Sequence, residues 1–295
     1  MRMTRLYRAG AIALPVVCTL LLSSAAPCQQ QASTAPVEYV AMGSSYAAGP
    51  GIGTRAPGSR AQCAQSSENY AHLFARKRGL KLIDVSCSGA TTESILKTWR
   101  SLPPQMQAVT PKTRLVTVTI GGNDVFFMAN LFAWSCQNAP HRASQTRRAA
   151  MCRATPDADL EAAFETLPGN FRKIVAGIHQ RAPSAIIVFV DYVTLLPETG
   201  ACPDKLPLSQ DELEKSRSVA YRLAAITQTV ANQTGSDLLK ASDLTKEHDV
   251  CSSDAWVNGF QFAGAPSAFA PVPYHPTAQS MQAVADALDR MLPQF

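Results

Sequence analysis

The chain has 295 residues, of which 46% are hydrophobic and 17% are charged, and its formal net charge is +5. This composition excludes a wholly disordered protein and is sufficient for one large hydrophobic core. Three of the positive charges lie in the export signal predicted below, so the mature chain is nearly neutral and has no basic run. That balance argues against a nucleic-acid-binding protein.

Residues 1–25 have the organisation of a cleavable export signal. Three arginines without any acid are followed by an apolar run over residues 9–22 and by the small residues 23–25. A basic, an apolar and a small-residue segment in this order are typical of secretory signals. The apolar run is shorter than the about 20 residues that cross a bilayer, and no later run approaches that length. We therefore expect a secreted protein, extracellular or periplasmic, without an integral membrane span.

Residues 26–36 are small and polar, and we predict that they form a linker before a single domain over residues 37–295. Cys28, within this linker, is a candidate for a lipid anchor. However, Pro27 stands directly before it, where cleavage of a lipoprotein needs a small residue. Lipid anchoring is therefore not the favoured prediction, although it stays open.

Apolar runs of strand length alternate with segments of helical character along the domain. The runs contain β-branched residues and stop at polar or glycine-rich turns, as strands do. They cover residues 37–42, 82–85, 115–120, 185–190 and 238–239, and the helical segments cover residues 69–78, 158–181, 210–234 and 277–291. This alternation predicts an α/β fold, a three-layer sandwich whose mainly parallel five-stranded sheet is flanked by helices. The long connections 134–156 and 200–275, apart from the helix and the weak strand within the second, are expected to be ordered loops over one end of the sheet.

Six cysteines lie in the predicted domain, after two that fall in the signal and the linker. An even number is typical of exported proteins with disulfides. No close C-x-x-C pair is present, so a structural zinc site is not expected. The six are Cys63, Cys87, Cys136, Cys152, Cys202 and Cys251. Their pairing is open at this point, because six cysteines can pair in many ways.

The first predicted strand ends in Gly43-Ser44-Ser45. A serine in the turn after a strand presents its hydroxyl, and small neighbours let a substrate approach, so Ser45 is a candidate nucleophile. A glycine-serine turn alone is more often a plain connection. Ala47 stands where the G-x-S-x-G motif of α/β-hydrolases has its second glycine, which argues against that fold.

The turns after the second and third predicted strands contain candidate hydrogen-bond donors. Gly89 can offer an unobstructed backbone N–H, and Asn123, in Gly121-Gly122-Asn123-Asp124, can offer side-chain N–H groups. Such donors suit the negative oxygen that develops during acyl transfer. In the alternative interpretation the turns only begin helices, with Asp124 as the cap of the helix that follows it.

A histidine precedes the last predicted helix in Tyr274-His275-Pro276. Histidine is the usual general base near neutral pH, and a proline after it constrains the start of the helix. The other four histidines lack such a frame and are interpreted as surface residues. In open α/β sheets the site forms where the carboxyl ends of the strands converge, so His275 can meet the strand-end motifs there.

In this order, Ser45, Gly89, Asn123 and His275 resemble the four sequence blocks of the SGNH (GDSL-like) hydrolase family over nearly the whole predicted domain. The cysteine positions are also similar to those of the secreted three-disulfide lipases and esterases of the actinobacterial type. The resemblance implies the SGNH fold, Ser45 as nucleophile, His275 as base, and an oxyanion hole made of the N–H groups of Ser45 and Gly89 and the Asn123 amide. It also implies catalysis with neither a metal nor a cofactor. Finally, it implies disulfides between sequence neighbours, Cys63 with Cys87, Cys136 with Cys152, and Cys202 with Cys251.

Two positions depart from the family pattern. Ser44 stands where the family has an aspartate, and Val272 stands where it has an acid three residues before the histidine. A backbone carbonyl can hold the imidazole in place of a carboxylate, as the similar lipases and esterases are thought to do. We therefore predict a Ser–His dyad in which the Val272 carbonyl orients His275. A nearby acid such as Asp249 is the alternative.

Aromatic and aliphatic side chains near the motifs favour an acyl chain as part of the substrate. They are Phe126, Phe127, Met128, Leu131, Phe132, Trp134, Phe260, Phe262 and Phe269. The predicted protein is a monomeric lipase or esterase that cleaves carboxylic esters through an acyl-serine intermediate. Fatty-acyl esters are the favoured substrates, and phospholipids are among the candidates. The alternatives are a carbohydrate or aryl-ester esterase of the same fold and a catalytically silent binding domain. For the enzyme, an ordinary imidazole pKa predicts that kcat/KM falls below about pH 6 to 7.

Overall fold

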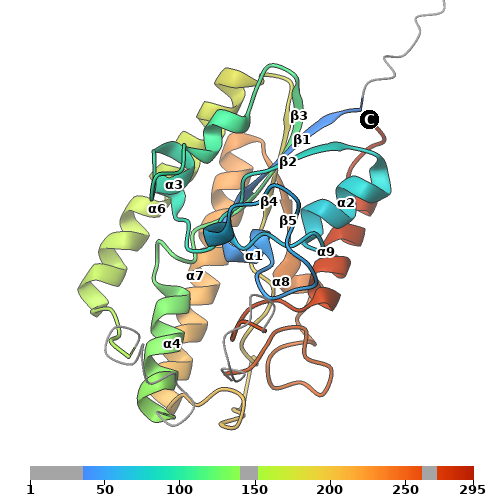
Figure 1. Cartoon of the computed structure of the whole chain (residues 1–295). Coiled ribbons are helices and arrows are strands. Elements are labelled where there is room, and N and C mark those ends of the chain that lie inside the picture. The colour runs from blue at the N-terminus through green and yellow to red at the C-terminus, as the bar shows by residue number, and fades with distance from the viewer. Residues whose placement is uncertain (1–35, 140–151, 261–270) are drawn as a thin grey trace, which may run out of the picture. The chain divides into compact units, whose positions relative to one another are not determined.

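The computed structural model describes residues 36–139, 152–260 and 271–295. In these residues five parallel strands form one sheet in the order β2-β1-β3-β4-β5 (Figure 1). The strands are β1 (Glu38–Gly43), β2 (Lys81–Asp84), β3 (Thr113–Thr119), β4 (Ile186–Val190) and β5 (Asp237–Leu239). Each lies where an apolar run predicts it, and the predicted α/β fold with a parallel five-stranded sheet is confirmed.

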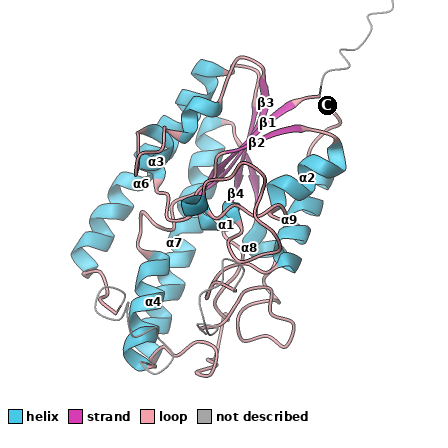
Figure 2. Ribbon diagram, in the orientation of Figure 1, coloured by secondary structure: helices cyan, strands magenta, loops and turns pink. Residues whose placement is uncertain are grey.

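Helices cover both faces of the sheet, as a parallel sheet requires. Figure 2 shows α2 and α9 on one side of the strands and α3, α6 and α7 on the other. The helices are α1 (Ser45–Ala48), α2 (Tyr70–Arg78), α3 (Thr92–Leu96), α4 (Phe127–Asn138), α6 (Asp157–Arg181), α7 (Gln210–Thr234), α8 (Ala241–Leu244) and α9 (Ala278–Met291), with 3-10 turns at Ala61–Cys63 and Gln105–Ala108. The described chain therefore has the predicted three layers.

Local sequence signals explain why the α7 helix begins and ends where predicted. The α7 helix starts with a capping box, in which Ser209 and Glu212 satisfy each other's backbone N–H groups, and it ends at Gly235 in the left-handed conformation. By contrast, α4 has no capping side chain, because its N-cap is Phe126 in the left-handed conformation. Sequence analysis indicates a helix after Asp124 only as an alternative and without bounds, and residues 134–138, expected in a loop, belong to this helix.

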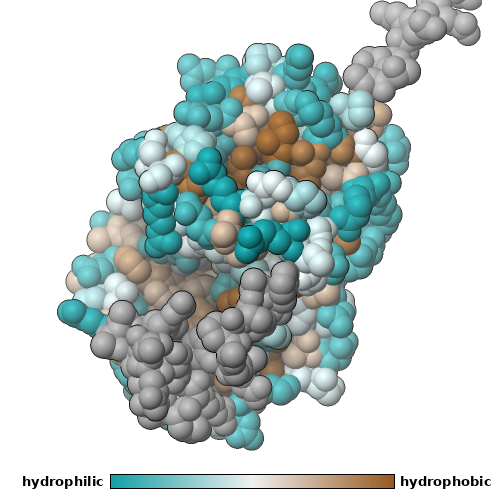
Figure 3. Space-filling view, viewed as in Figure 1, coloured by the Kyte–Doolittle hydropathy of each residue, from teal (hydrophilic) through white to brown (hydrophobic). Residues whose placement is uncertain are grey.

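The central strands β1, β3 and β4 are largely buried because helices cover the sheet on both sides, whereas the edge strands β2 and β5 are partly exposed. All of β1 is buried, and Arg114, near the amino end of β3, is the exposed exception in that strand. The face of the molecule seen in Figure 3 is mostly hydrophilic, with an apolar area over the strands in its upper part. Because the strands are parallel, the turns after β1, β2 and β3 gather at one edge of the sheet, where a site is expected.

Within the described residues, three disulfides join Cys63 to Cys87, Cys136 to Cys152, and Cys202 to Cys251. These are the pairs that the family resemblance implies. The first ties the segment after β1 to the turn after β2, and the third ties the segment before α7 to the long segment that leads to α9. Each stabilises the fold by about 3 kcal/mol, mainly because it restricts the unfolded chain.

Candidate active site

The serine predicted as nucleophile lies in the tight turn between β1 and α1. Gly43 ends β1 with a φ of +146°, and a Cβ at this position would lie 2.3 Å from the Thr119 carbonyl oxygen. Ser44 donates its backbone N–H to the same oxygen (2.9 Å). Ser45 is the first residue of α1, so its own N–H has no acceptor within that helix. Glycine at position 43 thus permits the close approach to β3 that positions Ser45.

Ser45 and His275, which are 230 residues apart in sequence, meet beside this turn. The His275 Nε2 lies 2.7 Å from Ser45 Oγ, and both residues are buried. The His275 Nδ1 lies 2.8 Å from the carbonyl oxygen of Pro273. Because a carbonyl can only accept a hydrogen bond, Nδ1 carries the ring proton and Nε2 can accept the serine proton. This is the geometry of a serine nucleophile with its general base.

The carbonyl that holds the imidazole belongs to Pro273, so the prediction of Val272 in this role is wrong. The Val272 carbonyl accepts the backbone N–H of His275 (3.2 Å) and the side-chain amide of Asn258 (3.2 Å). The cause is the left-handed conformation of Tyr274, whose φ is +61°. It reverses the chain, so that the nearer carbonyl faces the ring while the farther one closes the turn.

The alternative partner of the histidine, Asp249, has a different role. Its carboxylate accepts the backbone N–H of Cys251 (2.7 Å) and so closes a local turn. The inner imidazole nitrogen of His275 therefore has a neutral dipole as its partner and not a negative charge. A neutral acceptor still selects the tautomer and the orientation of the ring, which is the main task of the third member of a triad.

Backbone hydrogen bonds hold the segment that carries His275 against Asn258. The Asn258 N–H donates to the His275 carbonyl (2.9 Å), and the Tyr274 N–H donates to the Asn258 carbonyl (2.9 Å). Tyr46, directly after the serine, donates its hydroxyl to the Tyr274 carbonyl, and its ring centroid lies 5.3 Å from that of His275. Tyr46 therefore couples the serine turn to the histidine turn. Sequence analysis misses Tyr46 and Asn258, because their roles depend on contacts between distant segments.

The two further donors predicted for the oxyanion hole lie in neighbouring turns. Gly89 is exposed in the turn after β2, with a φ of +83°. Asn123, in the turn after β3, donates from Nδ2 to the carbonyl of Ala90 (2.9 Å). This bond joins the two turns and uses one of the two amide protons. The Cys87 N–H donates to the Gly43 carbonyl (3.0 Å), which joins the turn after β2 to the end of β1.

A tyrosine after β4 provides a partner for Ser44, which replaces the family's aspartate. The Tyr192 hydroxyl lies 3.2 Å from Ser44 Oγ and accepts the backbone N–H of Gly122 (2.9 Å). Burial raises the pKa of Tyr192 to about 12, so the phenol stays neutral. It thereby links the serine turn to the turn that carries Asn123. No pattern in the sequence indicates this contact.

A buried glutamine holds the end of β1 from the other side. Gln105 accepts the Gly43 N–H through Oε1 (2.8 Å) and donates from Nε2 to the Gly43 carbonyl (3.0 Å). One side chain thus satisfies both backbone groups of the residue that precedes the turn of Ser44 and Ser45. The amide geometry explains why a glutamine suits this position, since it carries one donor and one acceptor side by side.

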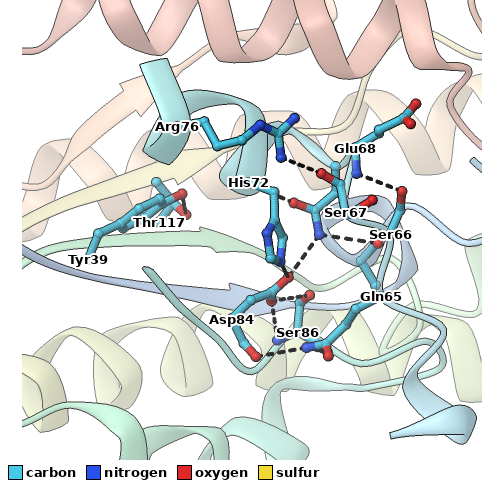
Figure 4. A network of polar contacts seen from close by, with 12 residues as sticks. Tyr39, Gln65, Ser66, Ser67, Glu68, His72, Arg76, Asp84, Ser86 and Thr117 are labelled. Carbon is cyan, nitrogen blue, oxygen red and sulfur yellow. Dashed lines mark hydrogen bonds and ion pairs between the residues drawn. The ribbon is translucent and has the colours of Figure 1, made fainter. Parts of the chain in front are cut away.

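A polar network fixes the carboxyl end of β2, from which Gly89 follows (Figure 4). The Asp84 carboxylate accepts the Ser86 N–H (2.9 Å) and the Ser86 hydroxyl (2.6 Å). Gln65 donates from Nε2 to the carbonyls of both Asp84 and Ser86, each at 2.8 Å. Because these bonds satisfy the backbone after the strand ends, the turn that presents Gly89 has a defined position.

Asp124 caps a different helix from the one that the sequence indicates. Its carboxylate accepts the backbone N–H of Thr92 (3.0 Å) and also the Thr92 hydroxyl, at the start of α3 and not of α4. Burial raises the pKa of Asp124 to about 6. Its role is to join the turn after β3 to the helix that follows Gly89.

The apolar side chains expected to line an acyl pocket divide into two groups. Phe127, Met128, Leu131 and Phe260 are buried and belong to the core. Phe126, Phe132 and Trp134 are partly exposed. Phe262 and Phe269 lie outside the described residues.

We expect kcat/KM to stay level from about pH 8 to 5 and to fall only at lower pH. Burial lowers the pKa of His275 to about 4, and the Pro273 carbonyl, which raises it, offsets only part of this effect. A protonated imidazole cannot accept the serine proton, so activity is lost as the pH falls through this value. The ordinary imidazole pKa assumed from the sequence does not include the effect of this burial.

The test is the pH profile of kcat/KM on a neutral ester, with circular dichroism at each pH to separate protonation from unfolding. The folded state excludes the proton that the unfolded chain binds, so stability also falls below the ordinary histidine pKa of about 6.5. A midpoint near pH 6.5 in protein that is still folded would contradict the burial of the ring.

Comparison with known proteins shows which family the chain resembles. Residues 41–283 match the family of GDSL-like lipases and acylhydrolases. Lipase 2 of Streptomyces coelicolor is 30% identical over 267 residues, which cover 89% of this chain and 87% of that protein. A lipase of Streptomyces rimosus is 28% identical over 279 residues, which cover 94% of each protein.

Two solved structures are similar over most of the chain. Phospholipase A1 from Streptomyces albidoflavus NA297 has a TM-score of 0.70 and 26% identity, with 88% of this chain and 100% of that chain covered. The extracellular lipase of Streptomyces rimosus has a TM-score of 0.69 and 25% identity, with 87% of this chain and 100% of that chain covered.

Proposed function

The chain belongs to the GDSL-like lipase/acylhydrolase family and is a carboxylic ester hydrolase, and on this premise we propose that Ser45 and His275 cleave fatty-acyl esters through an acyl-serine intermediate. The observation that carries the proposal is the 2.7 Å contact between His275 Nε2 and Ser45 Oγ, with Nδ1 bound to a carbonyl. This arrangement leaves the free electron pair of Nε2 directed at the serine proton. It supports a dyad without a carboxylate.

The reaction proceeds by two acyl transfers. Ser45 Oγ attacks the ester carbon while its proton passes to His275 Nε2, and the carbonyl oxygen becomes negative. The bond to the alcohol then breaks, and His275 returns the proton to the departing alkoxide. Water repeats the sequence on the acyl-serine, so that the acid is released and the serine recovers its proton. Apart from the ester and the water, every step uses only groups of the chain itself.

The negative oxygen would be bound by the N–H groups of Ser45 and Gly89 and by the Asn123 amide. Three features support this assignment. The Ser45 N–H has no acceptor within α1. Gly89 is exposed in its turn. One proton of the Asn123 amide is held by the Ala90 carbonyl, which orients the other. Donors fixed in this way need no reorganisation when the charge develops.

Secretion is part of the proposal. Residues 1–25 act as the export signal, residues 26–36 as a linker and residues 37–295 as the hydrolase domain, which works as a monomer without a cofactor. The three disulfides support an oxidising compartment. Among the helices of the described residues, none combines the length and the hydropathy of a membrane span. The similar Streptomyces rimosus enzyme is an extracellular lipase.

Chain-length profiling tests the substrate class. We expect kcat/KM on p-nitrophenyl esters to rise from acetate to medium and long acyl chains, because Phe126, Phe132 and Trp134 leave apolar surface accessible. A preference for acetate alone would favour the carbohydrate or aryl-ester esterase.

Labelling by a fluorophosphonate is expected on Ser45, and a protein that neither reacts with this probe nor cleaves any ester would be a silent binding domain.

A further inference from the structure

The segment after α3 contains a tight hairpin in an unusual conformation. Trp99 and Leu102 exchange two backbone hydrogen bonds, of 3.0 and 2.8 Å. The two residues between them, Arg100 and Ser101, have φ values of +46° and +64°. Hairpins of this kind usually place asparagine, aspartate or glycine at these positions, because a side chain disfavours positive φ. An arginine kept there against its conformational preference points to a use for its side chain.

The hairpin presents this arginine next to the predicted oxyanion donor Gly89. A Cβ built on Gly89 would lie 3.6 Å from the Trp99 ring and 3.9 Å from Arg100 Nη1. The Arg100 guanidinium lies over the Trp99 ring, 4.4 Å from its centroid. Gln62 Nε2 donates to the Arg100 carbonyl (3.4 Å), which connects the hairpin to the segment of the first disulfide. The cation is therefore placed by the ring beneath it and by its own backbone.

Arg100 has no ion pair within the described part of the chain, and its side chain is exposed. The nearby acid Glu93 is paired with Lys97 at 2.9 Å. A guanidinium stacked on an aromatic ring keeps its planar fork of N–H groups free, and this fork matches the oxygens of phosphate and carboxylate groups. The charge beside Gly89 is thus available to a ligand.

We propose that Arg100 binds an anionic group of the ester substrate, a phosphate or a carboxylate, and that the enzyme thereby prefers anionic esters to neutral ones. An ester whose carbonyl oxygen is bound by the Gly89 N–H has its substituents within reach of the guanidinium. The proposal rests on the proposed function, because it assumes that Gly89 contacts the reacting carbonyl. It deepens that function by assigning the class of substrate.

The test compares three soluble esters with the same acyl chains, namely dihexanoyl glycerophosphate, the hemisuccinate of dihexanoylglycerol, and dihexanoylglycerol itself, each as dispersed single molecules. For Arg100→Gln we expect kcat/KM on the anionic esters to fall about tenfold, as the loss of one charge-assisted hydrogen bond predicts, with the neutral ester changed less than about twofold. Arg114→Gln is the control, because it removes the same charge from an exposed side chain at the amino end of β3, whereas the site lies at the carboxyl ends of the strands. It should leave all three values unchanged. Arg100→Lys should retain part of the preference, since it keeps the charge without the fork.

The outcomes test the role of Arg100 separately from the proposed function. A loss confined to the phosphate ester identifies a phosphate site, and a loss on both anionic esters identifies a general anion site. Raising the salt concentration should weaken the wild-type preference but leave Arg100→Gln unaffected. An unchanged ratio of anionic to neutral kcat/KM, or an equal loss on all three esters, would overturn the role of Arg100 while the hydrolase activity stands. Failure of the wild-type enzyme to cleave any of the esters would instead refute the proposed function.

Discussion

Ser45→Ala and His275→Ala should each lower kcat for ester hydrolysis by a factor on the order of 10⁵, and the double variant should be no worse than either single one. The reason is that the two side chains act as one unit, in which the hydroxyl at 2.7 Å from Nε2 is a nucleophile only while the ring takes its proton. The measurement is kcat on a p-nitrophenyl ester for the three variants, made with protein whose folding has been checked by circular dichroism.

Matched controls separate this effect from the mere loss of a serine or a histidine. Ser218, exposed on α7, and His179, exposed in the last turn of α6, lie outside the site, and their alanine variants should retain full activity. Fluorophosphonate labelling should disappear in Ser45→Ala and become much slower in His275→Ala. Ester turnover that is undiminished in Ser45→Ala would refute the proposed mechanism.

Asn123→Ala should lower kcat by about 10²- to 10³-fold and leave KM nearly unchanged. The amide is proposed to bind an oxygen that is strongly negative only in the transition state, so its loss affects the chemical step more than the binding of the substrate. The expected cost equals about 3 to 4 kcal/mol of transition-state stabilisation. The measurement is the separate determination of kcat and KM for a neutral ester.

A structural role for Asn123 must be distinguished from this catalytic one, because its Nδ2 also bonds the Ala90 carbonyl. Thermal unfolding of Asn123→Ala should show only the small loss expected for one hydrogen bond, about 1 kcal/mol. Asn232→Ala, at an exposed position of α7, serves as the control and should change neither kcat nor Tm. A variant that loses activity by a higher KM at constant kcat would contradict the assignment of Asn123 to the oxyanion hole.

The elements that sequence analysis finds are those with a strong local cause. The strands β1, β3 and β4 contain apolar runs because a parallel sheet covered on both faces buries most of their side chains. The α7 helix begins at a capping box and ends at a glycine, both of which are visible in the sequence. The bounds of α4 are missed because Phe126 gives no capping signal and the apolar residues that follow could equally form a pocket wall. Packing decides that Phe127 and Leu131 face the core.

The amino-acid sequence by itself determined the α/β class, the candidate nucleophile and base, and, through the family resemblance, the three cysteine pairs. These depend on residue types, their order and their position after apolar runs. Only the tertiary structure decided that the Pro273 carbonyl holds the imidazole, that the Tyr192 hydroxyl contacts the Ser44 hydroxyl, and that burial lowers the pKa of His275. The physical reason is that these features depend on the direction of one carbonyl after a left-handed residue, or on burial by segments far away in the chain, and neither leaves a pattern among neighbouring residues.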